Sequence, residues 1–145
     1  MLTKADFLNA LDTKGFGYFP YSSEDTFELL HYESTTYSIV RVPVEYIESL
    51  AAFAAHAYLR LKRAPTSEEK ASLSVSSGDA SLIERHLQQI DYSDTPSSVR
   101  FKALAMRGLG NFEAVVQIGG YDLCSDLIVA KTEDFYVYFH WYTTG

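Results

Sequence analysis

The sequence predicts one α+β domain over residues 1–145, built on an antiparallel sheet. β-Branched and aromatic residues are dense over 26–42, and strand-like segments follow one another in the last third of the chain. Between these regions, apolar residues recur at helical spacing from residue 43 to residue 63. We therefore expect an N-terminal hairpin and a C-terminal meander in one sheet, with a long Ala-rich helix and shorter helices covering one of its faces.

The N-terminal segment predicts a helix with both ends marked. Thr3 can cap the helix, and Asp6 stands three residues later, where its carboxylate can reach back to the cap. Gly15 suits the end of the helix. Residues 16–23 are rich in aromatic rings, but Pro20 restricts them to an edge strand or an extended loop.

Residues 26–42 predict two strands joined by a turn near 33–35. Pro43 suits the first position of the helix that follows, which we expect to continue to Arg63. The alanines of this helix would let it lie close to the sheet. Its apolar face repeats at intervals of three and four residues: Val44, Ile47, Leu50, Ala51, Ala54, Ala57, Tyr58 and Leu61.

The middle of the chain is less regular. Residues 64–80 are rich in serine and predict a loop, with one helical turn after Thr66. Ser81 and Glu84 have the spacing of a capping box and predict a short helix through Gln89.

The last third predicts three or four antiparallel strands in succession. Residues 98–107 alternate in a strand-like way, but a helix remains an alternative there because Leu104 and Met106 fit neither period well. Residues 112–119 predict the next strand, and two more are expected on either side of 131–134.

No recognisable catalytic motif occurs in the sequence. A phosphate-binding P-loop and a nucleophile elbow are both absent. Cys124 is the single cysteine, so an internal disulfide is impossible, a structural zinc site is not expected, and its thiol is read as a small buried apolar group. We therefore predict no catalytic residue, no metal, no cofactor and no enzymatic activity. None of the histidines stands at metal-ligand spacing from another: His31, His56, His86 and His140.

The chain is acidic, with a net charge of −7 at neutral pH. Such a charge repels nucleic acid and anionic membranes and attracts basic surfaces. Solubility alone is the alternative explanation. Two acidic stretches, 24–33 and 79–94, supply the candidate partner-binding acids: Glu24, Asp25, Glu28, Glu33, Asp79, Glu84, Asp91 and Asp94.

The sequence predicts neither a targeting signal nor a membrane span. The N-terminal residues include Lys4 and Asp6 and lack the apolar core of a secretory signal. The longest apolar run, Leu50–Ala55, is far shorter than the ~20 residues of a membrane-spanning helix. We expect a cytoplasmic protein without a membrane partner.

The last predicted strand is unusually aromatic. Because side chains alternate along a strand, one set is expected to face the core: Phe135, Val137, Phe139 and Trp141. The other set carries polar tips, which favour one dry end and one wet end: Tyr136, Tyr138, His140 and Tyr142. Either a helix or loop covers this second face and satisfies its polar tips, or the face recognises a partner or ligand.

In general character, the chain resembles the stand-alone immunity proteins that neutralise bacterial toxins, especially nucleases: small, acidic, single-domain and without catalytic motifs. The resemblance concerns the whole chain and no motif, so it transfers no residue roles. It implies an inhibitor that occludes a basic site on a protein partner, with acidic side chains mimicking the negative charge that this site binds. This is the function that we expect.

Two other classes of function stay open. One is a small-ligand-binding domain or an enzyme with a Tyr/His-lined pocket around His140, and the other is a subunit that self-associates. The positions of the tyrosines and acids distinguish them. An exposed convex patch would indicate the inhibitor, a cleft the ligand-binding domain, and a symmetric seam the self-associating subunit.

The charge leads to a first prediction. With no basic stretch longer than Arg60–Arg63, the isolated protein should not bind DNA or RNA at physiological salt. A mobility-shift assay with micromolar protein at ~150 mM salt should show only free nucleic acid. A retarded band under these conditions would contradict the prediction.

Overall fold

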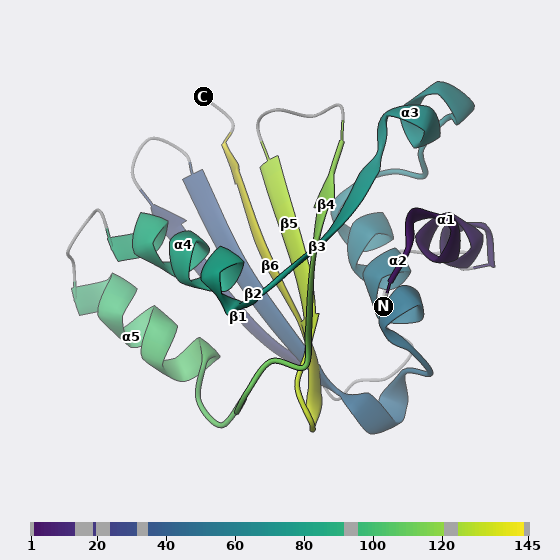
Figure 1. The fold of residues 1–145 in the computed structure, drawn as a ribbon. Helices are drawn as coiled ribbons and strands as arrows, with labels where there is room; N and C mark the ends of the chain where they lie inside the picture. The colour runs from purple at the N-terminus through teal and green to yellow at the C-terminus, as the bar shows by residue number, and fades with distance from the viewer. Residues whose placement is uncertain are drawn as a thin grey trace.

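A computed structural model describes residues 2–13, 19, 24–31, 35–91, 96–120 and 125–143. Within these ranges the chain forms one antiparallel sheet with helices on both sides (Figure 1). The strands are β1 (Asp25–His31), β2 (Thr35–Pro43), β3 (Ser74–Gly78), β4 (Ala114–Gly119), β5 (Ser125–Lys131) and β6 (Phe135–Thr143). The helices are α1 (Lys4–Thr13), the 3-10 helix η2 (Val44–Tyr46), α2 (Leu50–Leu61), α3 (Ser67–Ser72), α4 (Ala80–Asp91) and α5 (Pro96–Ala105).

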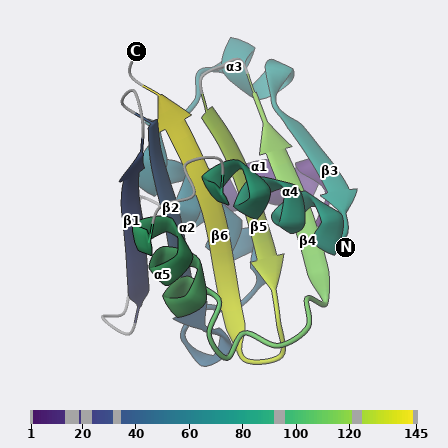
Figure 2. The ribbon, with the colours of Figure 1, turned by 90° about the vertical axis from the view of Figure 1, so that its left-hand side faces the viewer.

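The strand order in the sheet is β1-β2-β6-β5-β4-β3, and every neighbouring pair is antiparallel. The N-terminal hairpin β1–β2 and the C-terminal meander β4–β5–β6 therefore meet where β2 pairs with β6. Figure 2 shows this order across the sheet, with β1 at one edge and β3 at the other. The predicted α+β fold, with hairpin and meander in one antiparallel sheet, is confirmed.

The sheet separates two apolar cores. The first lies under α1 and α2 and includes Phe53 of α2 with Val40 and Val129 of the sheet. The second lies under α4 and α5 and includes Ile90 with Ile39 and Phe139. Figure 1 shows the two helix pairs on opposite sides of the sheet. The Ala-rich helix covers one face as predicted, and the second helix pair covers the face that the prediction left without a helix.

The N-terminal helix is capped as expected, because the Asp6 amide donates to Oγ1 of Thr3 at 3.1 Å and the Thr3 amide donates to the Asp6 carboxylate at 3.4 Å. The helix end predicted at Gly15, the segment 16–23 apart from Phe19, and residues 33–34 of the turn predicted at 33–35 lie outside the described residues. So does Cys124. Thr35, the last residue of that predicted turn, begins β2.

The long helix is shorter than predicted at its start. β2 continues through Pro43, and the Val44 amide donates to the carbonyl of Asp134 at 3.0 Å, so this segment remains attached to the end of the sheet. α2 begins only at Leu50, where Oγ of Ser49 accepts from the Ala52 amide at 3.1 Å. A proline can stand either at the end of a strand or at the first position of a helix. Pro43 stands in the strand here, because β2 pairs with β6 as far as this residue.

Most of residues 98–107 belong to helix α5, so the strand predicted there is wrong and the helical alternative is correct. The buried side chains of α5 are Ser98, Phe101 and Ala105, at intervals of three and four residues. Leu104, which fitted neither period well, is exposed, and so is Val99. Contact of one helical face with the sheet therefore decided the conformation.

The serine-rich segment contains a strand that the sequence did not predict. α3 forms after Thr66 with a complete capping box to Glu69, as expected for one helical turn. The following residues, predicted as loop, form β3 against β4. A short edge strand needs little apolar sequence, because only Val75 among its side chains reaches the core.

The residue that caps the start of α4 is not the predicted Ser81. Asp79 caps the helix, since its Oδ1 accepts from the Ser81 amide at 2.9 Å. The Ser81 hydroxyl donates to the same carboxylate at 2.5 Å instead of capping the helix itself. These two hydrogen bonds lower the pKa of Asp79.

The packing of α2 on the sheet predicts the effect of enlarging Ala54. This side chain is 0% exposed in the core under α2. Ala54→Leu should lower the free energy of unfolding by about 1–3 kcal/mol, because the extra methylenes have no space. Chemical denaturation measures the change. Ala103→Leu, on an exposed position of α5, should change stability little and serves as the control. Equal stability of both variants would show that α2 does not pack tightly.

Candidate functional site: a cleft beside the last strand

The alternation of β6 is as predicted. Val137 and Phe139 are buried in the core under α4 and α5, while Tyr136 and Tyr138 lie in the core under α2. Exposure on the α2 face increases only at the C-terminal end of the strand: Tyr138 is 2% exposed and Tyr142 is 38% exposed. The C-terminal end of β6 is more exposed because α2, which covers this face, ends at Leu61 before it reaches the end of the strand.

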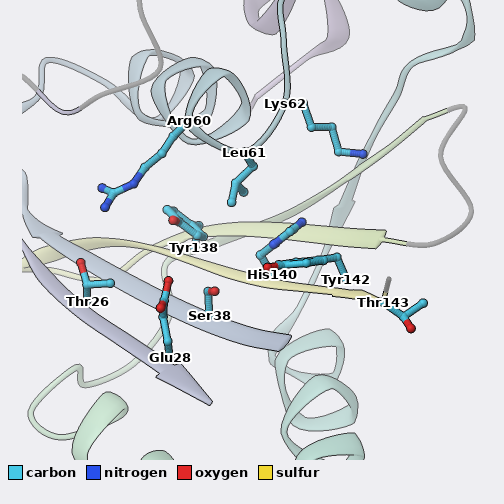
Figure 3. A pocket seen from close by; sticks show the side chains of 10 residues that line it. All are labelled: Thr26, Glu28, Ser38, Arg60, Leu61, Lys62, Tyr138, His140, Tyr142 and Thr143. Atoms are coloured by element: carbon cyan, nitrogen blue, oxygen red, sulfur yellow. The ribbon is translucent and has the colours of Figure 1, made fainter. Parts of the chain in front are cut away.

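A cleft of about 450 Å³ opens where α2 ends. The helix borders it from one side and strands β1, β2 and β6 border it from the other (Figure 3). Its lining residues are Thr26, Glu28, Ser38, Arg60, Leu61, Lys62, Tyr138, His140, Tyr142 and Thr143.

Tyr138 forms the deepest polar part of the cleft. Its ring packs near Phe19 and Phe53, with ring centroids 6.4 and 6.3 Å away. Burial raises the pKa of Tyr138 to about 12; Arg60 opposes this shift and the nearby glutamates add to it. The phenol is therefore neutral at physiological pH, and it can donate a hydrogen bond into the cleft.

Arg60 extends from α2 across one side of the cleft (Figure 3). Its guanidinium donates to the carboxylate of Glu24 at 2.5 Å and lies 5.2 Å from the centre of the Phe19 ring. Burial acts to lower the pKa of Arg60, but the hydrogen bond that Arg60 donates to Glu24 and the neighbouring negative charges outweigh it, so the pKa is raised. Arg60 thus remains charged, and Glu24 largely neutralises that charge locally.

Glu28 supplies the negative charge of the cleft wall. It projects from β1, on the opposite side from Arg60 (Figure 3). Its side chain is exposed and makes no ion pair with any residue that the structure describes. Lys62 lies at the end of the cleft away from Glu28 (Figure 3). The cleft therefore has an acidic side at β1 and a basic end beyond α2.

His140 and Tyr142 form an aromatic wall beside these charges. Their ring centroids lie 5.6 Å apart with an angle of 32° between the planes. His140 is buried, whereas Tyr142 is partly exposed to solvent. Together with the phenol of Tyr138 and the carboxylate of Glu28, this wall offers hydrogen bonds, negative charge and a π-face. These are means of binding a ligand.

The predicted tyrosine and histidine positions separate into two groups. Tyr138, His140 and Tyr142 line the cleft, as a partly reachable face requires. Tyr136 does not: it is buried, its ring stacks on Phe53 at 5.4 Å, and burial raises the pKa of its hydroxyl. Tyr136 is therefore covered by a helix, the first of the two possibilities considered for this face, because α2 lies directly over it.

The predicted acids do not gather on one surface. Glu28 lines the cleft and Glu24 reaches it through Arg60. Asp25 instead pairs with Arg41 at 3.1 Å, beside the end of α5. Asp79 and Glu84 belong to the segment of α4, on the opposite face of the sheet. Three acids cannot be placed, because they or their side chains lie outside the described residues: Glu33, Asp91 and Asp94.

The sequence did not reveal the other half of the cleft. Arg60 and Lys62 read as basic residues that suit a helix C-terminus, and Ser38 and Thr26 read as ordinary strand residues. They become neighbours only in the folded chain, where the end of α2 lies beside the N-terminal hairpin and the last strand.

Over the described ranges, no helix is long and apolar enough to cross a membrane. Within the same ranges, no three side chains of His, Cys, Asp or Glu are grouped so that they could hold a metal ion. Comparisons with protein-family models, with curated proteins and with solved structures found no match for this chain.

The buried phenol of Tyr138 predicts a loss of stability at alkaline pH. Its folded-state pKa of about 12 lies above the unfolded value of about 10, so the unfolded chain releases this proton first. The stabilisation is complete below pH ~10 and falls by about 2–3 kcal/mol as the pH rises toward 12. Tyr138→Phe should flatten this part of the profile, measured by urea denaturation at each pH.

The exposed Tyr142 provides the matched control, because Tyr142→Phe removes a phenol hydroxyl from the same cleft at a position outside the core. Tyr37 and Tyr136 contribute to the slope in every variant, since burial raises the pKa of both hydroxyls. Identical slopes for wild type and Tyr138→Phe would mean that the Tyr138 hydroxyl is in contact with solvent.

Proposed function

We propose that this protein is a non-enzymatic binding protein, and that its cleft receives a cationic group of a partner. Glu28 carries the proposal: it is an exposed carboxylate in the cleft wall, without an ion pair among the described residues and on the same lining as the partly exposed ring of Tyr142. A carboxylate together with an aromatic face favours an ammonium or guanidinium group.

The acidic composition supports a basic protein as the partner. A net charge of −7 attracts a basic surface over a distance and accelerates association, while contacts in the cleft slow dissociation. In this proposal the partner inserts one lysine or arginine side chain beside Glu28. Asp79 and Glu84, on the opposite face, act only through their long-range field.

The acidic composition favours a more specific form of this proposal. In that form the protein is an inhibitor of the immunity type, which occludes the basic site of a toxin such as a nuclease. The cleft refines the mechanism expected from the sequence. Recognition here depends on a concave site with one exposed carboxylate, in addition to a broad acidic surface. Association driven by that field should slow with added salt.

A small polar ligand is the second candidate, and the size of the cleft favours it. About 450 Å³ lies within the range of small-molecule sites, which combine aromatic walls with a few polar groups. Such a ligand would carry a cationic group toward Glu28 and place its remaining atoms against Leu61 and Tyr142.

The two candidates predict different behaviour in native cell lysate. Lysate separated into a macromolecular and a dialysable fraction is applied to wild type, Glu28→Gln and Glu84→Gln. If the partner is a protein, wild-type bait captures a basic protein from the first fraction, and Glu28→Gln captures roughly tenfold less because a charged hydrogen bond is lost. Glu84→Gln removes the same charge on the other face and should capture as much as wild type.

Mass spectrometry of the captured proteins and the melting temperature with each fraction are the measurements. Stabilisation by the dialysable fraction alone, lost in Glu28→Gln, would identify the small-ligand candidate. Equal capture and equal stabilisation for all three proteins would show that the cleft does not recognise a cation.

A further inference from the structure

A second cavity lies on the other face of strand β1. It has a volume of about 470 Å³ and lies between β1 and α5. Its apolar surface is formed by Phe27 and Leu29 of β1 and by Phe101 and Leu104 of α5. Arg100 and Glu28 are its charged lining residues. We call this cavity the β1–α5 groove. No residue of β2 lines it, so it opens beside the edge strand and not above the middle of the sheet.

The cleft and the β1–α5 groove share two lining residues, Thr26 and Glu28. The strand register explains this. Glu28 pairs with Ser38 on the α2 face, whereas Phe27 pairs with Ile39 on the α5 face. β1 therefore has a polar cavity on one face and an apolar cavity on the other, and both reach the outer edge of the sheet.

The outer edge of β1 is open among the described elements. β1 is the last strand on its side, and no described helix or strand lies beyond it (Figure 2). Its seven residues contain no proline or lysine, and its charged side chains, Asp25 and Glu28, are both acidic, so they oppose pairing with an acidic strand but not with a basic one. The most exposed large apolar side chain in the described part of the chain, Leu30 at 75%, also belongs to β1.

We propose that β1 is a docking edge for an extended segment of a partner protein, which adds to the sheet as a further strand. Side chains of an added strand alternate between the two faces, so they would enter the two cavities in turn. One set would lie against Phe27 and Leu29 in the β1–α5 groove, and the other would lie beside Glu28 at the cleft.

Charge and polarity define the sequence of this segment. Positions facing the groove favour apolar side chains, because aromatic and aliphatic residues make up half of its lining. Its two charged lining residues, Arg100 and the shared Glu28, have opposite signs, so the groove itself favours neither sign of charge. Positions facing the cleft favour lysine or arginine opposite Glu28. The partner segment therefore alternates apolar and basic residues. Its basic half rests on the proposed function, whereas its apolar half rests on the groove and the open edge alone.

A second copy of this chain fits the edge less well. Antiparallel pairing of β1 with itself about its centre would place Glu28 opposite Glu28 of the other copy, and like charges in this position are destabilising. The net charge of −7 also opposes self-association. These two repulsions are the reason for assigning the edge to a basic segment of another protein.

The probe is a synthetic seven-residue peptide, the length of β1, with alternating valine and lysine and blocked ends. A peptide of the same composition in two blocks, and a peptide with glutamate in place of lysine, are the sequence controls. Titration of isotope-labelled protein, followed by NMR amide shifts, detects binding down to millimolar affinity. We expect shifts at residues 25–31 with the alternating peptide, and little change with either control.

Two matched pairs of variants separate the parts of the proposal. Leu104 lines the groove and is 47% exposed, whereas Val99 is 59% exposed on the same helix and does not line it. Leu104→Arg should weaken binding roughly tenfold by introducing bulk and like charge, and Val99→Arg should not. Glu28→Gln should also weaken binding, with Glu84→Gln as its control.

The outcomes are distinguishable. Binding that is unaffected by Leu104→Arg, or an absence of shifts at 25–31, overturns strand addition even if Glu28→Gln weakens binding at the cleft. Binding that depends on Leu104 but not on Glu28 supports strand addition and overturns cation recognition. A dimer of the unliganded protein in sedimentation velocity that dissociates on Leu104→Arg would assign the edge to a second copy instead. Unchanged melting temperatures of the exposed-site variants confirm that folding is intact.

Discussion

The pairing of β2 with β6 is the contact on which the rest of the molecule depends. Nine residue pairs, from Thr35 with Thr143 to Pro43 with Phe135, join an early segment to the end of the chain. This register decides which side chains share a face, because a slip of one residue would exchange the two faces of β6. It places Val40 beside Tyr138 under α2, and Ile39 beside Phe139 under α4 and α5.

The cleft forms because strand β6 extends further along the sheet than helix α2, which covers it. β6 continues through Thr143, whereas α2 begins at Leu50, after β2 and η2, and ends at Leu61. The last turn of the helix therefore lies near Tyr138 and leaves Tyr142 without cover. The same strand provides core at Tyr136 and a surface at Tyr142, which reconciles a mostly buried aromatic strand with a recognition role for its end.

The polar groups of the cleft are held in defined states by their surroundings. Glu24 neutralises Arg60, and burial keeps Tyr138 as a neutral donor. Glu28 has the opposite environment, because an edge strand leaves its carboxylate exposed next to the cleft. The position of β1 at the edge thus has two effects: it makes a single charge available, and it puts two cavities of different polarity within reach of one extended ligand.

Local physical chemistry was readable from the sequence. The cap at Thr3, the helical turn after Thr66, the alternation of β6, the hairpin and the meander all depend on neighbours within a few residues, and the structure confirms them. Tertiary contacts decided the conformation of the segments for which the local sequence pattern was ambiguous or gave the wrong prediction. Residues 98–107 became helical because one face meets the sheet, Pro43 remained in a strand because β6 pairs with it, and a polar segment became β3 because β4 offered an edge. The candidate site divides in the same way: its tyrosines and Glu28 were recognisable by type, but their meeting with Arg60 and Lys62, and the burial of Tyr136, follow from where α2 ends over the sheet.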